Sequence, residues 1–305
     1  MLPLTAPSIP AALEQLMSEV GPVWGTSVQT HVKLMVDSFS KLLVDAPKLA
    51  KVTRNVSYGS DPRNVVDIYE PIASSTGATP WPVVLFVHGG AFVEGEKDRT
   101  DEIYSNVAWF FARHGVLTVN VEYRLAPQHR FPAGTLDVAS VVDWMRRNAS
   151  LFGGDPSRIF LMGHSAGGAH AAHYAYDKSF HPSHGHGLAG LIVVSGRVRA
   201  EDSAENPNAE RIRAYYPTAA HMEQGSAVNF VSGASLATMI AVAQFENPLI
   251  DVHCVELFNF LTRCRRRAPR FVWLSRHNHT SSVAHFNTAD VVLGHHILDF
   301  IGNPQ

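Results

Sequence analysis

A serine inside a glycine-flanked turn is the first residue of this chain whose setting could do chemistry. Ser165 is the centre of Gly163-His164-Ser165-Ala166-Gly167, with an apolar run at 159–162 before it and small residues at 168–172 after it. This pattern predicts a sharp turn from a strand into a helix, too tight for side chains two residues on either side of the serine. Such a turn lifts the hydroxyl above the sheet and beside the unpaired N–H groups of a helix N-terminus. We interpret Ser165 as a nucleophile.

Two glycines after an earlier apolar run could stabilise the anion that this nucleophile would create. The motif His88-Gly89-Gly90-Ala91-Phe92 directly follows the run 83–87. Acyl transfer forms an alkoxide only in its tetrahedral intermediate, and rigid backbone N–H donors stabilise that alkoxide without reorganising. We assign the backbone N–H groups of Gly89, Gly90 and Ala166 to an oxyanion hole. An ordinary turn at a strand end is the alternative for the glycine pair.

These motifs resemble those of the hormone-sensitive-lipase-like carboxylesterases (bacterial family IV), which have the α/β-hydrolase fold. The resemblance is carried by segments 88–92, 123–127, 131–133, 153–159 and 163–168, which cover the middle third of the chain densely. Two positions depart from the family pattern: Ala91 replaces a usual third glycine, and His164 replaces a common Asp. Neither change removes a backbone donor. Arylformamidases share much of this pattern, so the substrate class stays open at this point.

A serine hydroxyl is a weak nucleophile at neutral pH and needs a neutral imidazole to take its proton. Three histidines, His277, His279 and His285, follow the apolar run 271–274. The resemblance favours His279, because the family's base precedes a small or aromatic residue and then a serine, as in His279-Thr280-Ser281. His277 and His285 are the alternatives. Each of the three could instead be a histidine of a loop or a helix start.

The carboxylate that orients the base is expected just after the strand pattern 238–245. The resembled family has Asp directly before Pro there, whereas this chain has Asn247 before Pro248. Asn cannot supply the negative charge that stabilises an imidazolium. We favour Glu246, which lies at the strand end itself, and keep Asp251, one helical turn further on, as the alternative. The order of nucleophile, acid and base is then that of α/β-hydrolases.

Alternating strand and helix patterns must position these residues. Strands are expected at 51–58, 65–69, 83–87, 116–122, 158–162, 188–194, 238–245 and 270–274. Helices are expected at 103–114, 134–148, 167–176, 251–266 and 288–301, and apolar residues at helical spacing predict further helices within the first fifty residues. The alternation predicts an α/β fold with a mostly parallel, eight-stranded sheet covered by helices on both faces. Ligands of such sheets bind beyond the C-terminal ends of the strands.

Length and composition fit a single domain, 1–305. A chain of 305 residues that is 46% hydrophobic can bury a large core. Residues 1–50 form either a helical arm packed on that core or half of a small cap, and the polar segment 196–237 is expected to be the cap insertion. Aromatic residues of this segment could line a pocket under the cap or pack within it, namely Tyr215, Tyr216 and Phe230.

The net charge argues against binding to nucleic acid or membranes, and the cysteine content indicates the compartment. The net charge of −2 gives no global attraction to nucleic acid or to an anionic membrane. No apolar stretch reaches transmembrane length, and the segment 1–5 has no basic region followed by an apolar core, so no signal peptide is expected. Cys254 and Cys264 fall nearly three turns apart in one expected helix, too far for a disulfide within it. We therefore expect free thiols in a reducing, cytoplasmic compartment.

Two clusters suggest binding sites at first sight. His181, His184 and His186 are interleaved with Pro and Gly and have no carboxylate next to them in the sequence, so a solvated loop is favoured over a metal site. An arginine run at the end of an expected helix complements the helix dipole, so we do not interpret it as a nucleic-acid patch. The run consists of Arg263, Arg265, Arg266 and Arg267.

Together these features predict a serine hydrolase that cleaves small carboxylic esters with Ser165, His279 and Glu246, and that needs no metal or cofactor. Hydrolysis of an amide such as an aryl formamide, which uses the same machinery, is the first alternative. A non-catalytic ligand-binding protein on the same scaffold, like the family-related plant gibberellin receptors, is the second. Those receptors lose the catalytic histidine, whereas this chain keeps a candidate. A homodimer stays open as an oligomeric state.

Overall fold

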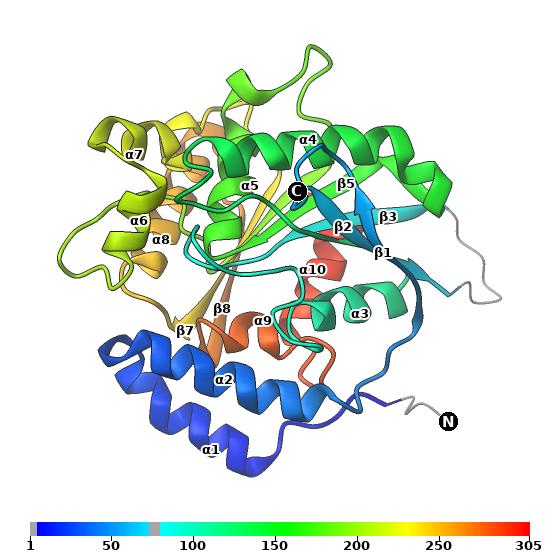
Figure 1. Ribbon diagram of the computed structural model, residues 1–305, viewed down its shortest axis with the longest axis vertical. Coiled ribbons are helices and arrows are strands. Elements are labelled where there is room, and N and C mark those ends of the chain that lie inside the picture. Colours follow the sequence, from blue (N-terminus) through cyan, green and yellow to red (C-terminus); the bar gives the residue numbers. More distant parts are fainter. Residues whose placement is uncertain (1–4, 73–79) are drawn as a thin grey trace.

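The computed structural model describes residues 5–72 and 80–305 (Figure 1). In this part of the chain eight strands form one sheet in the order β1-β2-β4-β3-β5-β6-β7-β8. The strands are β1 (Ala50–Ser57), β2 (Val65–Pro71), β3 (Trp81–Val87), β4 (Leu117–Val121), β5 (Gly154–His164), β6 (Gly190–Val194), β7 (Thr238–Phe245) and β8 (Arg270–Asn278). The pairs β1–β2 and β2–β4 are antiparallel, and all other pairs are parallel. Residues 1–4, part of the segment that lacks a signal-peptide pattern, lie outside the described residues.

Helices cover both faces of the sheet, and successive residues of the central strands alternate between two cores. In β3, Val83, Leu85 and Val87 pack in one core with α4 (Ala133–Asn148), α5 (Ala166–Tyr176) and α8 (Ile250–Arg265). The residues between them, Val84 and Phe86, pack in the other core with α3 (Ser105–Arg113) and α10 (Val292–Gly302). Burial of each such aliphatic side chain stabilises the folded state by roughly 1.5–3 kcal/mol relative to leaving it exposed. The predicted mostly parallel sheet, buried on both faces, is confirmed.

The N-terminal helices pack at one end of this assembly. They are α1 (Ala11–Val20), the 3₁₀ helix η1 (Gly21–Thr26) and α2 (Val28–Leu43). Figure 1 shows α1 and α2 side by side, with α2 near the short helix α9 (Ser281–Ala284). Met35, Phe39 and Leu43 recur at i, i+4 spacing and are fully buried in the same core as α3 and α10. The helical pattern predicted for the first fifty residues is confirmed.

The segment 196–237 contains two short helices, α6 (Ala209–Tyr215) and α7 (Ala219–Gly225), and the 3₁₀ helix η4 (Ala227–Phe230). Tyr215 stacks on Phe92, with ring centroids 4.8 Å apart, and Tyr216 meets the same ring edge-on at 5.4 Å. Phe230 lies edge-on against the ring of His173. All three aromatic residues therefore pack within the protein, and none lines the pocket described below.

Three expected boundaries were wrong by four residues each: the start of β5, which begins at Gly154 and not at 158, the end of β8 and the start of α10. The last strand, β8, continues past residue 274 to Asn278, because the N–H of Arg276 donates to the side chain of Gln244 at 2.7 Å and carries the strand through an irregularity. The last helix, α10, begins only at Val292, not at 288. Side-chain bonds hold the preceding residues in a loop: Thr288 donates to a backbone carbonyl and accepts from the N–H of Asp290. Such local bonds compete with a helix.

Candidate active site

Ser165 stands at the turn between β5 and α5. Its φ of 56° and ψ of −119° lie in a region that residues with a Cβ rarely occupy, a strain that costs of order 1–3 kcal/mol. A Cβ on Gly163 would overlap the carbonyl oxygen of Gly167, and one on Gly167 would overlap that of Val87. The predicted reason for the two glycines is confirmed. The backbone here has no room to relax, so the strained serine conformation is maintained.

We expect Gly167→Ala to destabilise the protein by at least about 2 kcal/mol, because the new methyl group meets backbone atoms of β3 that cannot rotate away. Denaturant unfolding measures the loss. Gly302→Ala is the matched control, since nothing lies within 4 Å of a Cβ at that position. Equal stability of the two variants would contradict this account of the turn.

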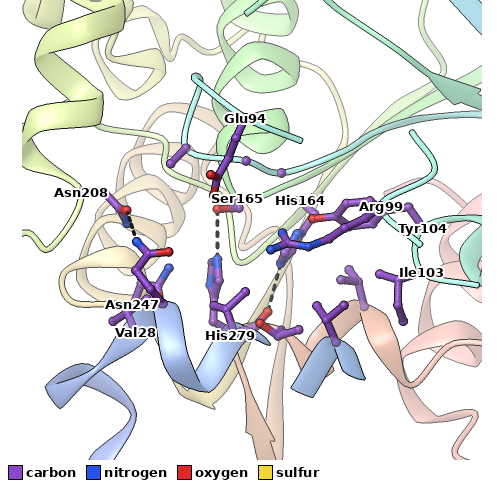
Figure 2. Close-up of a pocket in the computed structure, with 18 of the residues that line it drawn as sticks. Val28, Glu94, Arg99, Ile103, Tyr104, His164, Ser165, Asn208, Asn247 and His279 are labelled. Atoms are coloured by element: carbon purple, nitrogen blue, oxygen red, sulfur yellow. Dashed lines mark hydrogen bonds between the residues drawn. The ribbon is translucent and has the colours of Figure 1, made fainter. Parts of the chain in front are cut away.

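The structure brings Ser165, His279 and Glu246 into one hydrogen-bonded chain. Nε2 of His279 lies 3.0 Å from Oγ of Ser165, and Nδ1 lies 2.6 Å from Oε2 of Glu246 (Figure 2). A carboxylate can only accept, so Nδ1 carries the proton and Nε2 is free to accept from the serine hydroxyl. The other oxygen of Glu246 accepts from the N–H of Ala243 at 2.8 Å. The side chains of His279 and Glu246 are 5% and 2% exposed, so solvent hardly screens their interaction.

The rival histidines lie elsewhere. His277 is bonded on one side to Ser281 at 3.1 Å and on the other to Asp290 at 3.0 Å. His285 donates from Nδ1 to the carbonyl of Ser281, and burial lowers its pKa to about 3. Neither histidine is hydrogen-bonded to Ser165. Both stabilise the segment that follows His279.

The rival carboxylate, that of Asp251, is not hydrogen-bonded to the base. The carboxylate of Asp251 accepts from the adjacent N–H of Val252 in the first turn of α8. Asn247, which stands where the resembled family has Asp, accepts from Nε1 of Trp24 at 2.8 Å. Its side chain therefore ties the segment after β7 to η1 and is not hydrogen-bonded to His279.

His164, the residue before the serine, holds the backbone of His279. Its Nε2 lies 3.0 Å from the carbonyl oxygen of His279, which can only accept, so Nε2 carries a proton. The hydroxyl of Ser282 donates to the same carbonyl at 2.7 Å. Burial, reinforced by the nearby His279, keeps the pKa of His164 well below its usual range. The ring is therefore a neutral anchor, a contact that the sequence pattern did not reveal.

Free backbone donors lie beside the serine. In the described part of the chain the N–H groups of Gly89 and Gly90 have no protein acceptor, and both glycines line the same pocket as Ser165. The φ of Gly90 is 147°, and a Cβ there would overlap the carbonyl of Glu94, so only glycine fits. Ala166 begins α5 immediately after the serine. The assignment of these three N–H groups to an oxyanion hole stays a prediction.

The pocket above Ser165 is small, with a cavity volume of about 50 Å³. One water molecule needs roughly 10–15 Å³ of such a volume, so the pocket has room for only a few. Its apolar wall comes from α2 (Val28, Val32, Val36) and from Ile103, Tyr104 and Val283. Its polar lining includes Gln29, Glu94, Arg99, Asn208, Arg211 and Asn247. The sequence pointed to two segments that contribute here, 1–50 with α2 and 196–237 with Asn208 and Arg211, but it marked none of these residues individually as lining the pocket. No local motif marks them, because loops and helices far apart in the chain converge here.

The family model of the alpha/beta hydrolase fold matches residues 84–253, more than half of the chain, and includes both the glycine pair and the serine turn. The chain belongs to the α/β-hydrolase family. The resemblance read from the motifs is confirmed.

Relatives of this α/β-hydrolase carry esterase names. Esterase LipC of Mycobacterium tuberculosis is 40% identical over 115 residues, 38% of this chain and 27% of LipC. Carboxylesterase NlhH of the same species is 37% identical over 122 residues, covering 40% and 36% of the two chains. The isoprenylcysteine alpha-carbonyl methylesterase ICME of Arabidopsis thaliana is 33% identical over 156 residues, which cover 50% of this chain and 35% of ICME. The matched segment thus spans between about a quarter and about a third of these relatives.

Solved structures agree with the α/β-hydrolase fold over nearly the whole chain. A hyperthermophilic esterase from Pyrobaculum calidifontis superposes with a TM-score of 0.71 at 20% identity and covers 96% of this chain and 98% of that one. Esterase LipW from Mycobacterium marinum gives 0.68 at 18% identity, with 97% and 92% covered. At these identities the likeness establishes the fold.

Residues 5–72 and 80–305 contain neither a membrane-spanning helix nor a metal-binding cluster. No helix there is long and apolar enough to cross a membrane. Nor does that part contain a group of three or more potential ligand side chains placed to hold a metal ion. His184 of the histidine-containing loop lies 3.8 Å from Asp143, a carboxylate that its sequence neighbourhood did not reveal. Cys254 and Cys264 are both free, as predicted.

Proposed function

We propose that this protein is a serine hydrolase that cleaves small carboxylic esters through an acyl-enzyme intermediate. The observation that carries the proposal is the chain of hydrogen bonds from Ser165 through His279 to Glu246, next to unused backbone donors at Gly89 and Gly90. The esterase names of the relatives support the same reaction.

In the proposed mechanism His279 takes the proton of Ser165 while the serine oxygen attacks the acyl carbon. Glu246 stabilises the imidazolium, and the N–H groups of Gly89, Gly90 and Ala166 stabilise the alkoxide. The intermediate collapses when His279 passes its proton to the departing alcohol oxygen. A water molecule, deprotonated by the same histidine, then attacks the acyl-enzyme, releasing the acid and restoring the serine. These groups accomplish every proton transfer.

We also propose that α2 and the segment 196–237 form a two-part cap over a single hydrolase domain. Val28 of α2 and Asn208 of that segment line the same pocket. The side chain of Gln29 donates to that of Asn208 at 3.4 Å, which joins the two parts. The free cysteines support the reducing, cytoplasmic compartment proposed from the sequence.

We expect short acyl chains to be preferred. 4-Nitrophenyl butyrate should have a kcat/KM at least about tenfold above that of 4-nitrophenyl decanoate, because a long chain must displace well-packed side chains of α2. Val36→Ala removes two methyl groups from the apolar wall and so enlarges the pocket, which should shift the preference toward longer chains. A panel of 4-nitrophenyl esters beside an N-formyl anilide measures both the length preference and the ester-to-amide ratio. Preference for emulsified long-chain triglycerides would contradict the proposal.

A further inference from the structure

The charged side chains of the active-site pocket are not all paired. Arg211 and Glu94 form an ion pair across the pocket rim, with Nη1 and Oε1 2.6 Å apart, so their charges offset each other. Arg99 lines the same pocket, is only partly exposed, and has no hydrogen bond or ion pair with any described residue. One uncompensated positive charge therefore remains beside the nucleophile.

None of the acidic residues near Arg99 in the sequence pairs with it, and Glu96 and Asp101 are exposed to solvent. Asp98 pairs with Lys97 at 2.8 Å, and Glu102 pairs with Lys48 at 2.8 Å. The carboxylates of Asp98 and Glu102 thus have cations of their own. Arg99 is left facing the pocket.

The position of Arg99 makes its charge available to a substrate. In Figure 2 its side chain extends past Tyr104 and beside His164, with the guanidinium end toward Ser165. His164 itself adds no charge: burial is the main cause that lowers its pKa, and the charge of Arg99 contributes. The neighbouring wall is apolar at Ile103, which strengthens electrostatic interactions. A guanidinium here can bind an anionic group of the molecule whose carbonyl lies at Ser165.

We propose that Arg99 binds a carboxylate carried by the ester substrate, so that monoanionic esters are favoured over neutral ones. This inference rests on the proposed hydrolase function. The planar guanidinium matches a carboxylate through two parallel N–H···O bonds. A single unpaired cation balances one negative charge, which fits a carboxylate better than a phosphate group that carries nearly two.

Two pairs of esters test the proposal. One places the charge on the acyl side: the mono-4-nitrophenyl ester of adipic acid against 4-nitrophenyl hexanoate. The other places it on the alcohol side: 4-acetoxybenzoate against methyl 4-acetoxybenzoate. The readout is the ratio of kcat/KM for the anionic ester to that for its neutral partner. Comparing this ratio between variants cancels the intrinsic reactivity of each ester.

We expect Arg99→Gln to lower this ratio at least about tenfold for one of the pairs, since a charge-assisted bond is lost. Arg99→Lys keeps the charge and should retain most of the wild-type ratio. It keeps the test decisive if Arg99→Gln fails to fold. Arg147→Gln is the matched control: it removes the same charge from α4, where Arg147 pairs with Asp143 outside the pocket. Added salt should also reduce wild-type turnover of the anionic ester more than that of the neutral ester.

An unchanged ratio in Arg99→Gln for both pairs, with neutral esters still hydrolysed, would overturn this inference and leave the proposed function standing. A ratio that falls equally in Arg147→Gln would also overturn it. Wild-type protein that hydrolyses no ester above the rate of Ser165→Ala would overturn both.

Discussion

Ser165→Ala should lower ester turnover by at least about 10⁴-fold while the protein stays folded. The hydroxyl lies at the pocket, where it contacts His279 at 3.0 Å, so its removal deletes the nucleophile and little packing. Both serine and alanine carry a Cβ, so the strain at φ 56° is the same in the two proteins. Steady-state kinetics with 4-nitrophenyl butyrate measures turnover, and thermal unfolding measures the fold.

Covalent labelling gives an independent readout of the same prediction. A serine-directed organophosphate should add one phosphoryl group to the wild-type protein, detected as a mass increase on the peptide that contains Ser165. The alanine variant should stay unlabelled. Ser140→Ala is the control, since that exposed serine on α4 bonds only to a carbonyl of its own helix. Turnover that persists in a correctly folded Ser165→Ala protein would refute the mechanism.

Glu246→Gln is expected to reduce kcat by about a thousandfold or more. The variant keeps the size of the side chain but removes the charge that stabilises the imidazolium. It also places an amide opposite Nδ1 of His279, where the wild-type distance to the carboxylate is 2.6 Å. The imidazole then no longer has one preferred tautomer. Because both side chains are buried, water cannot replace the lost charge.

Two neighbouring variants separate this role from a general effect of charge near the site. Asp251→Asn removes a carboxylate that bonds only to the adjacent backbone, so it should change kcat little. Asn247→Asp should not rescue Glu246→Gln, because the side chain at 247 is held by Nε1 of Trp24 and that donor would hold a carboxylate equally well. A large loss of kcat in Asp251→Asn would assign the role of the acid to Asp251. Rescue of Glu246→Gln by Asn247→Asp would show that a carboxylate at 247 can also serve His279.

The sequence by itself determined the features that depend on local backbone preferences. Glycines at 163 and 167 are required by a turn that no other residue fits, so the strand–turn–helix unit around Ser165 was readable from a few neighbouring letters. The alternation of apolar runs and helical periodicity likewise predicted the sheet and its cover. The exceptions have local causes too: side-chain bonds of Thr288 and Asp290 hold a loop where periodicity predicted a helix.

The tertiary structure decided which distant side chains meet. Three histidines and two carboxylates satisfied the sequence pattern, but hydrogen bonds span 114 residues between Ser165 and His279 and 33 between His279 and Glu246. No local rule specifies such distances, because the direction of each side chain depends on the strand ends that the sheet brings together. The same holds for the pocket, where α2 supplies a wall to a serine more than a hundred residues away. Arg99 forms no ion pair there, since the fold pairs Asp98 and Glu102 with other cations and leaves Glu96 and Asp101 exposed to solvent.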